Sequence, residues 1–240
     1  MKLIFLIYLL IFSLPAWAEE KITAVYQAYG AGLNLIAATM DYQSKNDDFQ
    51  IQTTAQTKGA LRFLLEAKSI FSTNGKIKNN QFVIDDSSFV ALSKNKQKKR
   101  IVDLTNKPDF VDYQIAFLNM MALDNPHDKT FKVFDGKREL FISFKYHGEQ
   151  TVPFHKNGIY VGPADYYTVT IEVTAGKKSG WFFNRINNRQ SPALHVYFAS
   201  VDSSRKKVMV YSAFDTALFG QIQIFLSQLD YKDTSNAINH

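Results

Sequence analysis

The densest cluster of like charges in the chain is a basic run at residues 94–100. Its five cations are Lys94, Lys96, Lys98, Lys99 and Arg100, and no carboxylate lies among them. The like charges of such a run repel one another, so the segment is expected to be exposed to solvent. The favoured interpretation is a solvated hairpin tip, or a charged edge that blocks strand-to-strand aggregation. The functional alternative is contact with anionic lipid or lipopolysaccharide phosphates, worth about 1 kcal/mol per basic residue at a charged surface.

A second candidate surface combines adjacent aromatic residues with flanking cations. Its members are Lys177, Lys178, Trp181, Phe182, Phe183 and Arg185. Three consecutive aromatic side chains break the alternation of a strand, so at least one should face outward unless it is covered. Trp rings suit the head-group level of a membrane, and exposed apolar patches often mark contacts. The segment predicts contact with a membrane or a protein partner, or else a loop folded over one end of a sheet.

No motif in the chain demands a particular catalytic chemistry. Asp124, His127 and Asp128 lie close together in sequence, but a metal site needs converging ligands and supporting contacts, so exposed structural residues are the favoured interpretation. The chain has no cysteine, no Gly-x-Ser-x-Gly elbow and no Gly-rich phosphate loop. We therefore predict no catalytic residues, no metal and no cofactor. A hydrolase is kept as a remote alternative, because the members of a catalytic triad have no fixed spacing in sequence and cannot be recognised from it.

The first eighteen residues predict an export signal. Lys2 supplies a positive start, residues 3–14 form an uncharged apolar run, and Ala16-Trp17-Ala18 has the small-x-small pattern of a cleavage site. The apolar run is shorter than the roughly 20 residues that span a bilayer. We expect cleavage after Ala18 and a mature chain in the periplasm, without a lipid anchor because the chain has no cysteine. The alternative is an uncleaved N-terminal anchor.

Composition indicates a packed globule that folds without disulfides. The chain is 46% hydrophobic, with 20 Phe and 12 Tyr, and carries a formal charge of +6. A positive excess suits anionic partners, although an ordinary basic protein has the same property. Nucleic acid is not an expected partner of an exported protein. No shift in composition marks a boundary between domains. We therefore predict a signal peptide at 1–18, one β-rich domain at 19–231 and a flexible tail at 232–240.

Alternation with period two is the main structural signal. It is clearest at residues 49–56, 140–147 and 167–174, where apolar and polar side chains take turns. Weaker strand patterns cover 22–29, 33–42, 68–73, 76–84, 100–104, 131–134, 194–201, 207–213 and 221–229. Asn74-Gly75 and Asp135-Gly136 predict hairpin turns. Residues 59–67 and 113–123 predict short helices, and the second is closed by Asp124-Asn125-Pro126. The expected fold is mainly β: an antiparallel rolled sheet or barrel-like fold with one or two short helices.

The order of several short motifs carries a resemblance to a known family. The motifs are Tyr29-Gly30-Ala31-Gly32-Leu33, residues 57–61, the Ser72–Ile77 hairpin, an Asp112-centred helix start, residues 133–138, residues 144–149, residues 206–210 and Gly220-Gln221-Ile222. Together they resemble the bacterial exported family called domain of unknown function 3108, over Tyr26 to Leu229. A tryptophan expected where Val196-Tyr197-Phe198 stands is missing, as is a proline beside Val208. The resemblance implies an envelope location and a rolled or barrel-like antiparallel sheet, and it implies no catalytic residues.

Amphipathic strands, abundant aromatic residues and short apolar helices favour a non-catalytic module of the cell envelope. Such a sheet could bind an apolar or lipid-like ligand in a cavity, or the membrane surface. The same residues could instead fill a solid core. The second hypothesis is a protein-interaction or envelope assembly factor that uses the Trp181-Phe182-Phe183 loop or a sheet edge.

Overall fold

The computed structural model describes residues 19–79, 81–94, 96–176, 193–201, 206–216 and 219–233. Within these ranges two short helices, α2 (Gly59–Leu64) and α3 (Tyr113–Met121), accompany one sheet of 13 strands. The strands are β1 (Glu19–Gly30), β2 (Leu33–Lys45), β3 (Asp48–Thr57), β4 (Ala67–Lys78), β5 (Gln81–Ser93), β6 (Lys96–Ile101), β7 (Phe110–Val111), β8 (Lys129–Phe134), β9 (Glu139–Thr151), β10 (Pro163–Ala175), β11 (Leu194–Ser200), β12 (Lys207–Thr216) and β13 (Gly220–Asp233).

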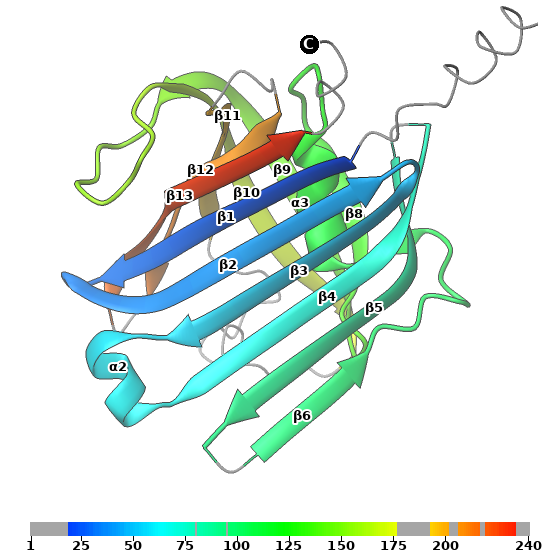
Figure 1. The fold of residues 1–240 in the computed structure, drawn as a ribbon, viewed down its shortest axis with the longest axis horizontal. Coiled ribbons are helices and arrows are strands. Elements are labelled where there is room, and N and C mark those ends of the chain that lie inside the picture. Colours follow the sequence, from blue (N-terminus) through cyan, green and yellow to red (C-terminus); the bar gives the residue numbers. More distant parts are fainter. Residues whose placement is uncertain are drawn as a thin grey trace, which may run out of the picture.

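The sheet is rolled but not closed. Its order is β6-β5-β4-β3-β2-β1-β13-β12-β11-β10-β9-β8-β7, so the first and last strands pair in its middle. Every pairing is antiparallel except that of β7 with β8. Figure 1 shows β1–β6 as a broad front wall, with α3 behind it and strands β8–β10 beyond the helix. The predicted rolled, mainly β fold is therefore confirmed.

The alternation read from the sequence corresponds to burial in the structure. Along β1 every second residue is buried, from Glu20 through Ile22, Ala24 and Tyr26 to Ala28 and Gly30. In β9 the apolar positions Leu140, Ile142 and Phe144 are at most 1% exposed. Side chains of a strand point alternately to its two faces, so one face of each strand enters the core.

Helix α3 lies inside the roll, which explains why it shows almost no amphipathic pattern. Ile115, Ala116, Leu118 and Met120 are all buried, and the helix contacts β5, β8 and β12. Its first turn is capped by Asp112, whose side chain accepts a hydrogen bond from the backbone N–H of Ile115. Both predicted helices are confirmed. Neither helix of the described ranges is long and apolar enough to cross a bilayer.

The hairpin predicted at Asn74-Gly75 is wrong. Strand β4 runs straight through both residues, with a register shift against β5 between them. A Cβ on Gly75 would lie 2.0 Å from the carbonyl oxygen of Val83, so this glycine permits a close approach of two strands. The turn follows β4 instead, where Asn79 adopts a φ of 51°. The turn predicted at Asp135-Gly136 is present between β8 and β9, where Gly136 adopts a φ of 81°.

The C-terminal strand is longer than its pattern predicted. Strand β13 continues to Asp233, which pairs with Glu20 at the start of β1. Lys232 and Asp233 of the predicted tail therefore belong to the sheet. Residues 1–18 and 234–240 lie outside the described residues, so the predicted signal peptide and the rest of the predicted tail stay predictions.

Candidate functional site

The inner face of β3–β6 can be traced from one contact with α3. Thr53 donates a hydrogen bond of 2.6 Å to Gln114 of the enclosed helix, so Thr53 faces into the roll. Its cross-strand neighbours face the same way, because directly paired residues share a face. Three inner rows result: Thr53, Phe71, Phe89 and Arg100; then Ala55, Ser69, Ala91 and Lys98; then Thr57, Ala67, Ser93 and Lys96.

On β3–β5 the last two rows carry only small side chains, and the rows leave a groove of about 590 Å³. Its lining residues are Ile36, Ala55, Gln56, Thr57, Leu65, Ala67, Lys68, Ser69, Ala91, Leu92, Ser93, Lys96 and Lys98. The rows fall in the half of the sheet that ends at α2, on the left in Figure 1, and at the β5–β6 turn, at the bottom of the picture. The volume lies within the roughly 300–1,000 Å³ typical of small-molecule sites. We call this cavity the inner groove.

The predicted basic run forms edge strand β6 and the turn before it. Lys96 and Lys98 belong to the inner rows and line the groove, whereas Lys99, opposite Val90, lies on the other face of the strand. Lys94 is exposed in the turn. Alternation along β6 therefore places Lys96, Lys98 and Arg100 on the inner face and Lys99 on the outer face, while Lys94 stays in the turn.

The inner groove is positively charged along its β6 side. No carboxylate is present among its lining residues. Lys96 and Lys98 are exposed, and within the described ranges neither ammonium group forms an ion pair. Two cations beside a floor of Ala and Ser side chains favour an anion attached to apolar material.

Two phenylalanines and an arginine occupy the inner row next to the groove. The rings of Phe71 and Phe89 lie 6.0 Å apart between centroids. The guanidinium carbon of Arg100 lies 5.7 Å from the centroid of the Phe89 ring, within the range of a cation–π contact. These side chains separate the open rows from the region that α3 fills.

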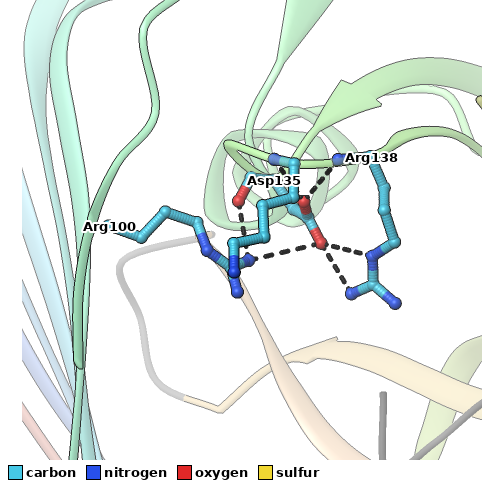
Figure 2. Close-up of polar contacts among 4 residues, drawn as sticks. Arg100, Asp135 and Arg138 are labelled. Carbon is cyan, nitrogen blue, oxygen red and sulfur yellow. Dashed lines mark hydrogen bonds and ion pairs between the residues drawn. The ribbon is translucent and has the colours of Figure 1, made fainter. Parts of the chain in front are cut away.

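Arg100 also joins the two edges of the open sheet. Figure 2 shows Arg100 and Arg138 meeting the carboxylate of Asp135, which is 3% exposed, from different sides. Arg138 approaches Asp135 Oδ2 at 2.6 Å through Nη2 and at 2.8 Å through Nε. Arg100 Nη1 lies 3.5 Å from the same oxygen and donates to the Asp135 backbone carbonyl at 2.9 Å. We call this cluster the edge latch, because it connects β6 with the β8–β9 turn.

A second ion pair supports the same junction. Lys107, in the segment between β6 and β7, pairs with Glu139 at the start of β9. The Lys107 ammonium also lies 5.0 Å from the ring centroid of Phe110 and 4.9 Å from that of Phe134. Side chains rather than a backbone ladder therefore bring the two sheet edges together.

A fully buried polar network holds the start of α3 against the front wall. Asp112 accepts hydrogen bonds from Thr73 (2.5 Å) and Ser87 (2.7 Å), and all three residues are 0% exposed. Burial raises the pKa of the Asp112 carboxyl, although the hydrogen bonds from Thr73, Ile115 and Ser87 oppose the shift. No substrate could reach these hydroxyls without unfolding, so the network is structural.

The remaining residues considered from sequence do not converge on one site. His127 Nδ1 contacts the backbone oxygen of Asn125, and Asp128 accepts a hydrogen bond from the backbone N–H of Tyr146. Within the described ranges no group of three potential ligands is placed to hold a metal ion. The aromatic candidate, with Lys177, Lys178, Trp181, Phe182, Phe183 and Arg185, lies outside the described residues and stays a prediction.

Sequence reasoning missed a histidine–tyrosine cluster on β9–β11. His195 Nδ1 lies 2.7 Å from the Tyr166 hydroxyl, and the ring of His147 stacks on Tyr166 at 5.1 Å. Burial raises the pKa of Tyr166. The histidines come from separate segments, so their meeting depends on strand register and gives no sequence signal. The inner groove was also missed, but its signal was present as small residues at every second position of 53–57 and 67–69.

Comparison with known proteins identifies a family and shows weak structural likeness. A family model described as "Protein of unknown function (DUF3108)" matches residues 24–227. A beta-barrel-like protein of domain of unknown function DUF1849 from Brucella abortus is 11% identical, with a TM-score of 0.44 over 90% of this chain and 98% of that one. A DUF1329 family protein from Desulfovibrio piger is also 11% identical, with a TM-score of 0.30 over 94% of this chain and 90% of its own. The search of curated proteins found no match.

Proposed function

This chain belongs to the DUF3108 family, and we propose that it binds an anionic amphiphile in the inner groove. The ligand class is a molecule with an apolar chain and one acidic end, such as a fatty acid or a lysophospholipid. The observation that carries the proposal is the pairing of a small-residue floor with Lys96 and Lys98 on one side. No catalytic step is part of the proposal.

The dimensions of the groove support an extended apolar chain. Along β5 the lining runs from Ala91 to Ser93, which is about 7 Å at roughly 3.4 Å per residue. Across the sheet the lining extends from Ile36 on β2 to β6, which is about 19 Å at roughly 4.8 Å per strand spacing. Burying apolar ligand surface there contributes about 25 cal/mol per Å².

A larger cleft of about 790 Å³ lies near the C-terminal end of α3 and is a weaker candidate. Several of its polar groups already contact protein groups. Lys107 pairs with Glu139, and His127 contacts the Asn125 carbonyl. Asn119 accepts from the backbone N–H of Phe82. Lys96 and Lys98 have no such ion pair in the described ranges, which favours the inner groove for an acidic ligand.

Binding of a fluorescent fatty acid tests the proposal directly. Lys98→Glu should weaken binding by about tenfold, because it replaces attraction of the acidic end by repulsion. Lys99→Glu is the matched control, since it makes the same charge change one residue along on the other face of β6. Equal affinities for the two variants would contradict the assignment of the groove.

A second variant tests the apolar half of the ligand. Ala91→Phe places a ring in the middle of the groove floor and should abolish binding of the long-chain probe. A short anionic probe such as acetate should bind wild type and Ala91→Phe equally weakly, because it buries little apolar surface. If Ala91→Phe binds the long probe as wild type does, the chain does not lie in this groove.

We also propose that the protein acts in the periplasm, supported by the signal-like segment 1–18. Fractionation of cells that express the chain with a C-terminal epitope tests this. The tagged protein should appear in the periplasmic fraction, shortened by the first eighteen residues. A full-length protein retained in the cytoplasm would contradict the proposal.

A further inference from the structure

We propose that the end of the sheet around α2 docks on an anionic lipid bilayer, with the mouth of the inner groove facing the membrane. This inference goes beyond the proposed function, because docking could occur whether or not the groove holds a ligand. The docking surface, called the α2 rim, consists of Leu33, Lys58, Arg62, Phe63, Leu65, Lys68 and Lys94.

The apolar part of the α2 rim is unusually exposed. Phe63 is 92% exposed, Leu65 50% and Leu33 48%. Leu61, by contrast, packs against the core cluster formed by Ala28, Leu35, Phe214 and Ile222. Helix α2 thus packs on the core through Leu61 and presents Phe63 to solvent. An exposed aromatic ring on a short anchored helix is suited to insertion among lipid head groups.

The backbone holds this rim in place against the sheet. The N–H of Lys58 donates to the Leu35 carbonyl at 2.8 Å, and Thr57 Oγ1 donates to the Leu65 carbonyl at 2.8 Å. The helix is therefore attached at both ends to strands that line the groove. Leu65 itself is one of the lining residues, so the rim and the groove mouth are continuous.

The charge of the chain is concentrated beside these apolar side chains. Residues 58–68 contain three cations and one anion, and residues 94–100 contain five cations and no anion. These two segments have a formal charge of +7, whereas the whole chain has +6. Both segments contribute to the lining of the inner groove, the first through Leu65 and Lys68 and the second through Lys96 and Lys98. A cationic rim around exposed apolar side chains complements an anionic bilayer, with attraction acting over about a Debye length.

The partner that this chemistry fits is a membrane rather than a protein pocket. The exposed apolar side chains described in the rim are Phe63 on α2, Leu65 directly after it and Leu33 at the start of β2. This set is sufficient for interfacial insertion but small for a stable protein interface. An amphiphile in the inner groove would have its acidic end near Lys96 and Lys98, close to the docked surface. Docking would therefore place the groove where such molecules are taken from or given to a bilayer.

Sedimentation of the purified protein with lipid vesicles tests the docking. The probes are vesicles of equal parts phosphatidylglycerol and phosphatidylcholine, and vesicles of phosphatidylcholine alone. Wild type should bind the anionic vesicles at low salt and lose binding at high salt. Lys94→Gln and Lys68→Gln should each weaken binding about fivefold, and Phe63→Asp should weaken it at least tenfold.

A matched aromatic control is available on another part of the surface. Phe154, in the segment between β9 and β10, is 77% exposed. Phe154→Asp makes the same chemical change and should leave vesicle binding unaltered. Neither substitution removes a buried side chain, so both variants should fold normally.

Two results would overturn the docking proposal. One is equal vesicle binding by Phe63→Asp and Phe154→Asp, and the other is equal binding of wild type to the two kinds of vesicle. The groove is tested separately in solution without lipid. Phe63→Asp should still bind the fatty-acid probe, and Ala91→Phe should still bind anionic vesicles, so failure of one proposal is distinguishable from failure of the other.

Discussion

The two walls of the roll have the same architecture but fill their inner faces differently. On the wall formed by β8–β11, the inner side chains Val133, Leu140, Phe144, Val169 and Val196 are at most 1% exposed. On the wall formed by β3–β6, the two rows nearest α2 carry Ala, Ser, Thr and Lys, and none of these residues is buried. Alternation specifies a strand in both walls, whereas the size of the inward side chains decides whether the space becomes core or groove.

This difference also explains how an open sheet keeps its shape. The filled wall is held by edge-to-face aromatic contacts, such as that of Phe144 with Phe131 at 5.9 Å. The hollow wall lacks such packing in its last rows and is attached through the edge latch and the Asp112 network. Polar contacts at defined points replace apolar packing on the side that leaves the groove open.

Truncating one phenylalanine in each wall should give the largest contrast. Phe144→Ala removes a ring that is 1% exposed and should lower the free energy of unfolding by about 4 kcal/mol. Phe89→Ala removes a half-buried ring beside the groove and should cost about 1 kcal/mol. Urea unfolding followed by circular dichroism measures both. If Phe144→Ala does not fold, Phe144→Leu should still cost more than Phe89→Leu; equal losses would contradict a filled and a hollow wall.

Breaking the edge latch should have the next largest effect. Asp135→Asn removes the charge that two arginines share in a site where Asp135 is 3% exposed, and should cost about 3 kcal/mol. Asp109→Asn is the control, because the Asp109 side chain is 75% exposed in its pair with Lys132 and should cost less than about 0.5 kcal/mol. Similar unfolding midpoints for the two variants would show that the latch does not join the walls.

The Asp112 network should make stability depend on pH in a defined direction. The folded-state pKa of Asp112 is raised, so the folded state binds this proton more tightly than the unfolded chain, whose pKa is about 3.9. Below the unfolded-state pKa this group does not destabilise the fold. The loss of folding stability develops as pH rises from the unfolded-state pKa through the folded-state pKa, and it is complete above the folded-state pKa. Asp112→Asn, which keeps an acceptor for the cap, should therefore gain stability relative to wild type between about pH 4 and pH 7.

A truncating variant separates the cap from the charge. Asp112→Ala leaves Thr73 and Ser87 without their acceptor and α3 without its cap, and should cost about 2 kcal/mol. Measuring the unfolding free energies of wild type, Asp112→Asn and Asp112→Ala at about pH 4 and about pH 7 checks both expectations. A difference between Asp112→Asn and wild type that does not change with pH would contradict the raised pKa.

Most of the fold could be predicted from the sequence because its signals are local. Alternating segments such as 140–147 and 167–174 lie within β9 and β10, and Asp112 lies at the predicted helix start. The hairpin prediction at Asn74-Gly75 was wrong because the same dipeptide occurs in turns and where two strands approach closely. Only the packing of Gly75 against Val83 decides between these two structures. Local sequence does not contain that information.

The candidate site could be predicted only in part, because it depends on which face each residue occupies. The basic run was recognised from charge, but the division between inward Lys98 and outward Lys99 needs the strand register. The edge latch joins Arg100 to Asp135, which lie on separate segments, and no spacing rule connects them. Contacts of this kind arise from the rolling of the sheet and have no local signature.

Adding a ring to the open groove should change stability less than any substitution above. The same ring added to the packed core should be costly, which contrasts the two regions. Ala91→Phe puts a ring into the open groove and should alter the free energy of unfolding by less than about 0.5 kcal/mol. Ala116→Phe puts the same ring into α3, where Ala116 is 0% exposed between packed strands, and should cost at least about 2 kcal/mol through overpacking. Because the side-chain change is the same, the larger part of the difference reports free space, and the smaller part reports the preference of Phe for a strand over a helix. A loss at Ala91 equal to that at Ala116 would mean that the groove has no room for a ligand chain.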